Sequence, residues 1–115
     1  MARIKFLFVL LITLNINSQN NAIGTAEKIT YTASYNMSGI LTDIAEVKME
    51  TSEMKTSSAT LLHLKCTATT YSDFDSYFKI RDLYESYVNP RTVTPYLYNR
   101  EINEGGYYKF VKYKY

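Results

Sequence analysis

The feature that most restricts the fold of this chain is the strict alternation of apolar and polar residues over positions 28–37. Successive side chains of an extended strand point to opposite faces, so a period of two is typical of a strand with one buried face. This segment therefore predicts a half-buried strand. Its alternating residues are Ile29, Tyr31, Ala33 and Tyr35 on one side, with Thr30, Thr32 and Ser34 on the other.

Five further segments alternate in a similar way and are separated by residues that favour turns. The expected strands cover 45–50, 62–70, 77–88, 96–102 and 107–115. The expected connections are a hairpin turn around Gly39, a polar loop at 51–58, a turn at 72–76, a break at Pro90 and a turn at 104–106. The sequence thus predicts an all-β protein with an antiparallel sheet.

The first eighteen residues have the order of a secretory signal peptide. Two basic residues precede an apolar run, and a polar segment that ends in Ser18 follows it. The uncharged apolar stretch 6–14 is shorter than the roughly 20 residues of a spanning helix, so no membrane span is expected after cleavage. We expect a signal-peptide helix at 1–18, a linker at 19–27 and the β domain at 28–115, with cleavage after Ser18 or Ala22 and a periplasmic or secreted location.

Charge and cysteine content narrow the function further. Removing residues 1–18 from the 115-residue chain leaves 97 residues with eleven basic and eleven acidic side chains. This length suits one small domain, and a neutral chain lacks the positive charge of a nucleic-acid binder. Cys66 is the only cysteine, so no disulfide is expected within the chain.

The residues with reactive side chains do not form a catalytic set. Cys66 and His63 lie three positions apart, so a strand places them on opposite faces. We interpret Cys66 as a buried, inert thiol and His63 as a solvent-exposed side chain on the polar face. Asp73 and Asp75 fit a turn better than a calcium loop, because the other ligands of such a loop are missing. We expect no enzyme activity, no cofactor and no metal.

Asp82 stands out because the alternation places it on the apolar face, together with Tyr84. An unpaired charge there would be costly, so Asp82 either pairs, with Arg100 across the sheet, or is turned outward by a bulge. A role in orienting a ligand is the alternative to structural pairing.

Tyrosine is concentrated in the second half, with ten of the twelve tyrosines from Tyr71 onward. Tyrosine favours strands, where its ring packs on the sheet and its hydroxyl reaches water or a partner. Some of these rings could line a concave surface for an apolar or sugar-like ligand, and ordinary sheet packing is the simpler interpretation. The set comprises Tyr84, Tyr87, Tyr96, Tyr98, Tyr107 and Tyr108. With Asp82 and Arg100, the first four of these tyrosines are the candidate ligand-binding residues.

Three stretches resemble an exported bacterial family, the domain of unknown function 3108. They are RDLYESYVN at 81–89, TVTPY at 92–96 and EGGY at 104–107, and the similarity extends from Ile29 to the last residue. The resemblance implies a curved antiparallel sheet, as an open or half-closed barrel similar to periplasmic lipoprotein carriers. It covers the first part of the family's usual length, and the last strand is still alternating where the sequence stops, so we expect a domain truncated at its C-terminal end. The asparagine-rich end of the leader resembles a Bacteroidetes export signal.

These patterns favour a non-enzymatic periplasmic binding or carrier-like module for a lipid, a lipoprotein or a glycan. The alternative is a structural or envelope-assembly protein that pairs with a partner through an exposed edge strand.

Overall fold

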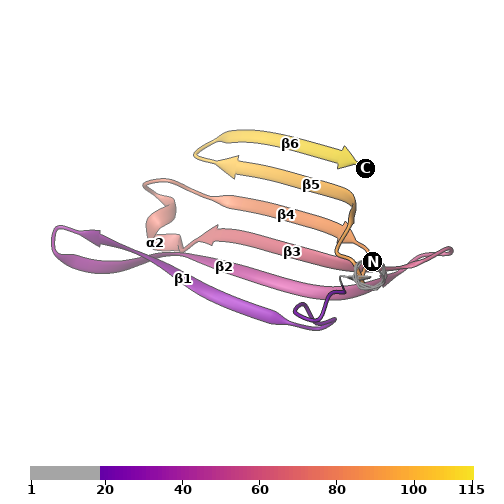
Figure 1. Cartoon of the computed structure of the whole chain (residues 1–115). Coiled ribbons are helices and arrows are strands. Elements are labelled where there is room, and N and C mark those ends of the chain that lie inside the picture. The colour runs from indigo at the N-terminus through magenta and orange to yellow at the C-terminus, as the bar shows by residue number, and fades with distance from the viewer. Residues whose placement is uncertain (1–18) are drawn as a thin grey trace, which may run out of the picture.

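The computed structural model describes residues 19–115, which form one antiparallel sheet of six strands in a single layer (Figure 1). The strands follow one another across the sheet in chain order, and β1 and β6 are its two edges. The prediction of an all-β antiparallel fold is therefore confirmed, with an open sheet. The predicted signal peptide lies outside the described residues. The elements are β1 (Lys28–Met37), β2 (Ile40–Lys55), β3 (Thr60–Thr70), α2 (Ser72–Asp75), β4 (Arg81–Val88), β5 (Pro95–Glu104) and β6 (Tyr107–Lys114).

Two of the hairpins turn on two residues each, as the sequence predicts. Ser38 and Gly39 connect β1 to β2 with φ values of 53° and 84°, and Gly105 and Gly106 connect β5 to β6 with φ values of 54° and 84°. Positive φ at both central positions is the geometry of a type I′ turn, which matches the twist of the flanking strands.

The loop predicted at 51–58 is wrong for most of its length. Strand β2 continues to Lys55 and pairs with β3 as far as Thr60, so the turn is confined to the four residues between them. Thr56 closes this turn, because its backbone N–H donates to the carbonyl of Ala59 at 2.8 Å. The polar composition of this segment hides its strand character, since both of its side-chain rows meet solvent.

The strand predicted at 77–88 begins later than expected. Residues 72–75 form one helical turn, α2, in which the N–H groups of Phe74 and Asp75 donate to the carbonyl of Tyr71. The chain then returns to the sheet through a single bridge between Ile80 and Glu104 before β4 starts. The Ser76 hydroxyl donates to the carbonyl of Asp73 in this segment, which is a turn of helix rather than a simple turn.

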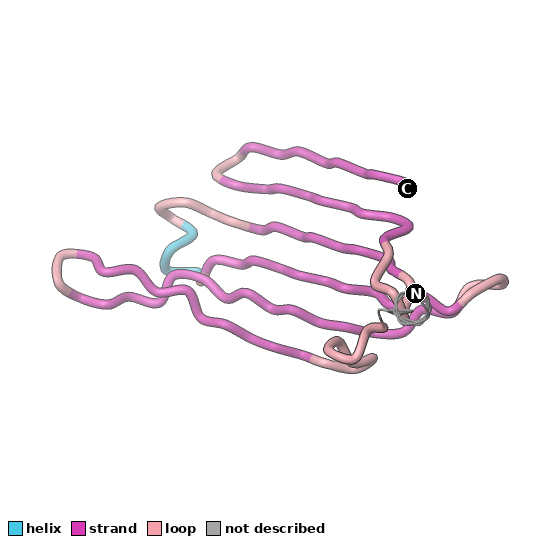
Figure 2. The backbone as a smooth tube through the Cα atoms, viewed as in Figure 1, coloured by secondary structure: helices cyan, strands magenta, loops and turns pink. Residues whose placement is uncertain are grey.

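The segment before β1 is tied to the same end of the sheet as the β4–β5 connection (Figure 2). The backbone N–H of Asn20 donates to the carbonyl of Arg91 at 2.6 Å, and the Asn20 side chain donates to the carbonyl of Pro90. Thr51 on β2 adds a bond to the carbonyl of Gly24 at 2.8 Å. The two bonds of Asn20 tie the start of the segment to the β4–β5 connection, and the bond of Thr51 ties Gly24 to β2.

The register gives the sheet two different faces, because opposed residues in antiparallel strands share a face. We call one the apolar face and the other the polar face. The apolar face carries Ile29, Tyr31, Val47, Met49, Leu62, Leu64, Cys66, Tyr84, Val88, Tyr98 and Val111. The polar face carries Glu46, Lys48, Glu50, His63, Lys65, Thr67, Glu85, Asn99 and Glu101.

Few side chains are fully covered in a single layer. Within residues 19–115 the buried apolar side chains are Ala45, Leu62 and Val88, and Leu62 lies directly opposite Val88. Ile29 and Met49 on the apolar face are each 45% exposed. The apolar face is thus open along much of its length.

Candidate ligand-binding face

A hollow of about 340 Å³ lies on the apolar face, beside the segment that precedes β1. Ligand pockets in proteins have volumes of roughly 300 to 1,000 Å³, so this hollow is large enough for a small apolar ligand. Six of the twelve residues around it have apolar or aromatic side chains, namely Ile23, Ile29, Met49, Leu64, Cys66 and Tyr84. The other six are polar or charged, namely Glu27, Glu50, Thr51, Lys65, Glu85 and Ser86, but apolar atoms form nearly all of the exposed surface of the hollow.

The register aligns these residues in a row that continues across the whole sheet. Each member lies directly opposite the next, so the row runs perpendicular to the strands with a spacing of roughly 4.8 Å. Its character changes from apolar on β1 to β3, through a phenol on β4, to a guanidinium on β5. We call it the cross-strand row, and its members are Ile29, Met49, Cys66, Tyr84, Arg100 and Val111.

The thiol and the phenol of this row are held in their neutral forms. Burial raises the pKa of the Cys66 thiol above its usual value. Burial also raises the pKa of the Tyr84 hydroxyl, with a further contribution from the negative charge of Asp82. At neutral pH the middle of the row therefore presents no negative charge of its own.

Arg100 is the charged member of the row, and part of it has no partner. Its Nε atom is buried and makes no hydrogen bond within residues 19–115. Arg100 also takes part in none of the ion pairs found in this part of the chain. A buried guanidinium N–H without an acceptor is costly.

The predicted pairing of Asp82 with Arg100 is wrong. Asp82 is 5% exposed, and its Oδ1 accepts the backbone N–H of Asn103 at 2.9 Å. Its carboxyl group also bonds to that of Glu104, which raises the pKa of Glu104. The register explains the difference, because Arg100 lies opposite Tyr84 rather than opposite Asp82.

The tyrosines singled out from the sequence do not form one surface. Tyr84 and Tyr98 lie on the apolar face, and the Tyr98 ring stacks on Tyr113 with centroids 6.1 Å apart. Tyr87 and Tyr108 lie on the polar face. Tyr107 lies opposite Glu104 and therefore on the side of Tyr98. Tyr96 lies at the irregularity where the pairing shifts from Tyr87 with Leu97 to Val88 with Pro95, and it is 46% exposed. Tyr84 and Tyr87 are three positions apart, so the sequence alone already predicts that a strand places them on opposite faces.

His63 is half-buried rather than solvent-exposed, so that prediction is wrong. Tyr87 lies directly opposite it, and the two rings stack with centroids 4.6 Å apart and an angle of 6° between planes. His63 Nε2 lies 2.7 Å from Oε2 of Glu85, which also accepts the Tyr87 hydroxyl at 3.2 Å. His63 and Cys66 do lie on opposite faces, as predicted.

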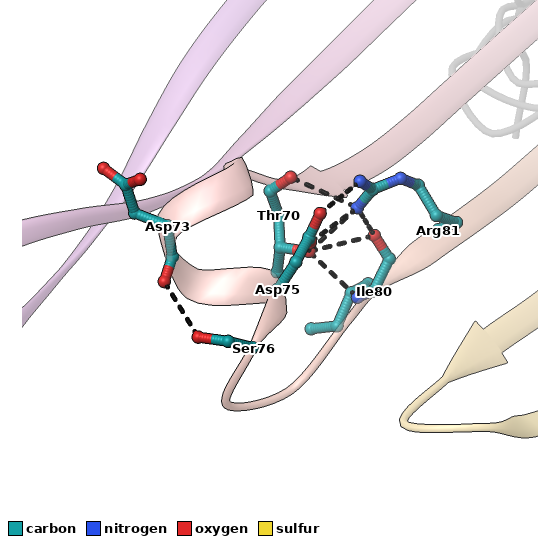
Figure 3. A network of polar contacts seen from close by, with 6 residues as sticks. All are labelled: Thr70, Asp73, Asp75, Ser76, Ile80 and Arg81. Carbon is teal, nitrogen blue, oxygen red and sulfur yellow. Dashed lines mark hydrogen bonds and ion pairs between the residues drawn. The ribbon is translucent and has the colours of Figure 1, made fainter.

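A second polar network fixes α2 between β3 and β4 (Figure 3). The Nη2 of Arg81 donates to Oδ2 of Asp75 at 2.7 Å, and the hydroxyl of Thr70 donates to Oδ1 of the same carboxylate. Thr70 also accepts the backbone N–H of Ile80 at 3.0 Å. The bonds from Arg81 and Thr70 both lower the pKa of Asp75, and the bond from Arg81 has the larger effect. Asp75 thus ties the helical turn to β3 and β4 through the side chains of Thr70 and Arg81.

Among residues 19–115, no group of three or more His, Cys, Asp or Glu side chains is placed to hold a metal ion. The same residues contain no helix with the length and apolar character needed to cross a membrane.

Comparison with known proteins matches residues 30–115 to the family described as "Protein of unknown function (DUF3108)". No match was found among curated proteins or among solved structures.

Proposed function

Since the chain belongs to the DUF3108 family of proteins of unknown function, we propose its function from the sheet itself: it is a non-enzymatic module that binds an apolar ligand of the cell envelope. The observation that carries the proposal is the hollow on the apolar face, whose exposed surface is formed almost entirely by apolar atoms. This lining favours a lipid or the acyl chain of a lipoprotein over a glycan, which needs more polar partners.

Burial provides the binding energy in this proposal. Each apolar methylene that leaves water contributes about 0.8 kcal/mol, and the exposed surfaces of Ile29 and Met49 leave water at the same time. Within residues 19–115 no second layer covers this face, so those side chains are accessible to a ligand.

The proposal also includes a periplasmic location and a non-enzymatic role. The periplasmic location rests on the predicted signal peptide at 1–18. A non-enzymatic role is supported by the opposite faces of His63 and Cys66, and by the contact of His63 with Glu85.

A matched pair of methionine variants tests the proposal. Met49 lies in the hollow, and Met54 lies on the same strand but on the polar face, with exposed fractions of 45% and 38%. The neutral fluorophore N-phenylnaphthylamine should bind the wild-type chain saturably. Met49→Glu should weaken this binding by about tenfold or more, because a carboxylate in an apolar site is unfavourable, and Met54→Glu should leave it unchanged.

Circular dichroism of both variants checks that the sheet is retained. Absence of saturable binding to the wild type, or equal losses in the two variants, would show that the hollow is not a binding site.

A second candidate, an assembly protein, is favoured by the geometry of edge strand β6. The backbone N–H of Tyr115 donates to the carbonyl of Tyr96 at 3.0 Å. In an antiparallel pair the backbone groups of every second residue point to the partner strand, so the odd-numbered residues 107–115 bond to β5. The groups that point away from β5 are therefore those of the intervening residues. These residues are Tyr108, Phe110, Lys112 and Lys114. An added strand with carboxylates opposite the two lysines would complete this edge.

Two proline variants test this edge. Phe110→Pro removes only an outward-facing N–H, whereas Val111→Pro removes a bond to β5, so Val111→Pro should be the more destabilising by about 1 to 3 kcal/mol in urea unfolding. A synthetic peptide in which glutamates alternate with threonines should bind the wild type in a salt-sensitive way and should not bind Phe110→Pro. Equal peptide binding to both proteins would exclude pairing at β6.

A further inference from the structure

We propose that the ligand of the apolar face is a single-chain amphiphile with an anionic head group, and that Arg100 binds the head while the tail lies in the hollow. This inference rests on the proposed function and specifies its ligand. It is drawn from the cross-strand row and from Arg100, which forms no ion pair within residues 19–115.

The row places the two ends of such a ligand at a fixed separation. Cys66 lines the hollow, and Arg100 lies two strands further along, at roughly 10 Å. Tyr84 stands between them and belongs to the lining of the hollow. An extended chain that lies across the strands would therefore pass from apolar side chains to a cation without leaving the face.

The chemistry of Arg100 suits a carboxylate or phosphate head. A guanidinium presents a planar fork of N–H donors that matches two oxygens of one anionic group. The Nε is buried and has no acceptor within the described part of the chain, so a head group would meet the terminal Nη groups of the fork.

The neighbouring carboxyl groups do not occupy Arg100. Asp82 is bonded to the Asn103 N–H and to Glu104. The neutral Tyr84 hydroxyl adds a donor between the tail and head positions.

Competition against N-phenylnaphthylamine tests the inference with two probes that share a tail. Dodecanoate carries an anionic head and dodecanol a neutral one. Wild-type protein at pH 8 should bind dodecanoate at least about tenfold more tightly than dodecanol. Arg100→Met should remove this preference and leave the affinity for dodecanol unchanged, while Arg100→Lys should restore part of it.

Arg91→Met is the matched control, because Arg91 is an exposed arginine in the β4–β5 connection, and it should retain the preference. Dodecyl phosphate, tested alongside, shows which anionic head is preferred, and a preference for either anion over dodecanol supports the inference.

The outcomes separate this inference from the proposed function. If neither the fluorophore nor either probe binds, the proposed function is wrong. If dodecanol competes as well as dodecanoate, the hollow binds apolar ligands but the head-group assignment is wrong. If Arg100→Met weakens the binding of dodecanoate and dodecanol equally, Arg100 stabilises the sheet and does not bind the head group.

Discussion

At the scale of single residues, the carboxyl pair of Asp82 and Glu104 makes stability depend on pH. The bond from Asp82 raises the pKa of Glu104 above its ordinary value of 4.5, so the folded chain keeps a proton that the unfolded chain has lost. The stability that this proton contributes is complete below pH 4.5 and is lost as pH rises through the raised pKa. Asp75 has the opposite sign, because its lowered pKa contributes stability above 3.8 that is lost on further acidification.

We therefore predict that the free energy of unfolding decreases as pH rises from 4.5 toward neutrality, and that Glu104→Gln removes this part of the decrease. Urea unfolding at a series of pH values measures it. Glu53→Gln on an exposed part of β2 is the control and should keep the wild-type slope. An unchanged slope in Glu104→Gln would show that the pair shares no proton in solution.

The partners of Asp82 and His63 show where residue-level prediction from the sequence ends. Alternation correctly placed Asp82 with Tyr84 and separated His63 from Cys66. It could not give the partners, because these depend on register between strands that are distant along the chain. Tyr87 covers His63 only because β3 and β4 align these two residues, and Arg100 misses Asp82 for the same kind of reason.

At the scale of elements, the two glycines of the β5–β6 turn have different requirements. Both have positive φ, but a Cβ on Gly105 would lie 2.2 Å from Cε2 of Phe78, whereas a Cβ on Gly106 would meet open space. Gly106→Ala should cost roughly 1 to 2 kcal/mol for the left-handed backbone alone. Gly105→Ala should cost more, because Phe78 must also move.

Urea unfolding of the two variants measures this difference. A double variant, Gly105→Ala with Phe78→Ala, should bring the added cost of Gly105→Ala close to that of Gly106→Ala. Equal costs for the two single variants would contradict the role of Phe78.

The sequence predicted strands and tight turns well where pattern and turn chemistry agree. The Ser38-Gly39 and Gly105-Gly106 turns fall where the glycines placed them. The end of β2, residues 51–55, was missed because polar residues lie on both of its faces. Its strand character comes from pairing with β3. The α2 turn was missed because it is stabilised by Arg81, which lies after it in the chain.

At the scale of the whole sheet, residues 19–115 provide one apolar face and no second layer to cover it. Sequence alternation predicted that such a face exists, but only the register showed that one row joins the hollow to Arg100. Residues of the hollow come from β1 to β4 and from the segment before β1. A ligand there contacts most of the sheet, so binding and global unfolding should be linked.

We predict that dodecanoate at a hundred times its Kd stabilises the wild-type chain by about 2.7 kcal/mol, because it binds the folded sheet and not the unfolded chain. For a domain of this size that corresponds to a rise in Tm of roughly 10 to 20 °C. Thermal unfolding followed by circular dichroism measures the shift. At the same concentration, Met54→Glu should show the full shift and Met49→Glu little or none. A shift of equal size in both variants would mean that dodecanoate binds away from the apolar face.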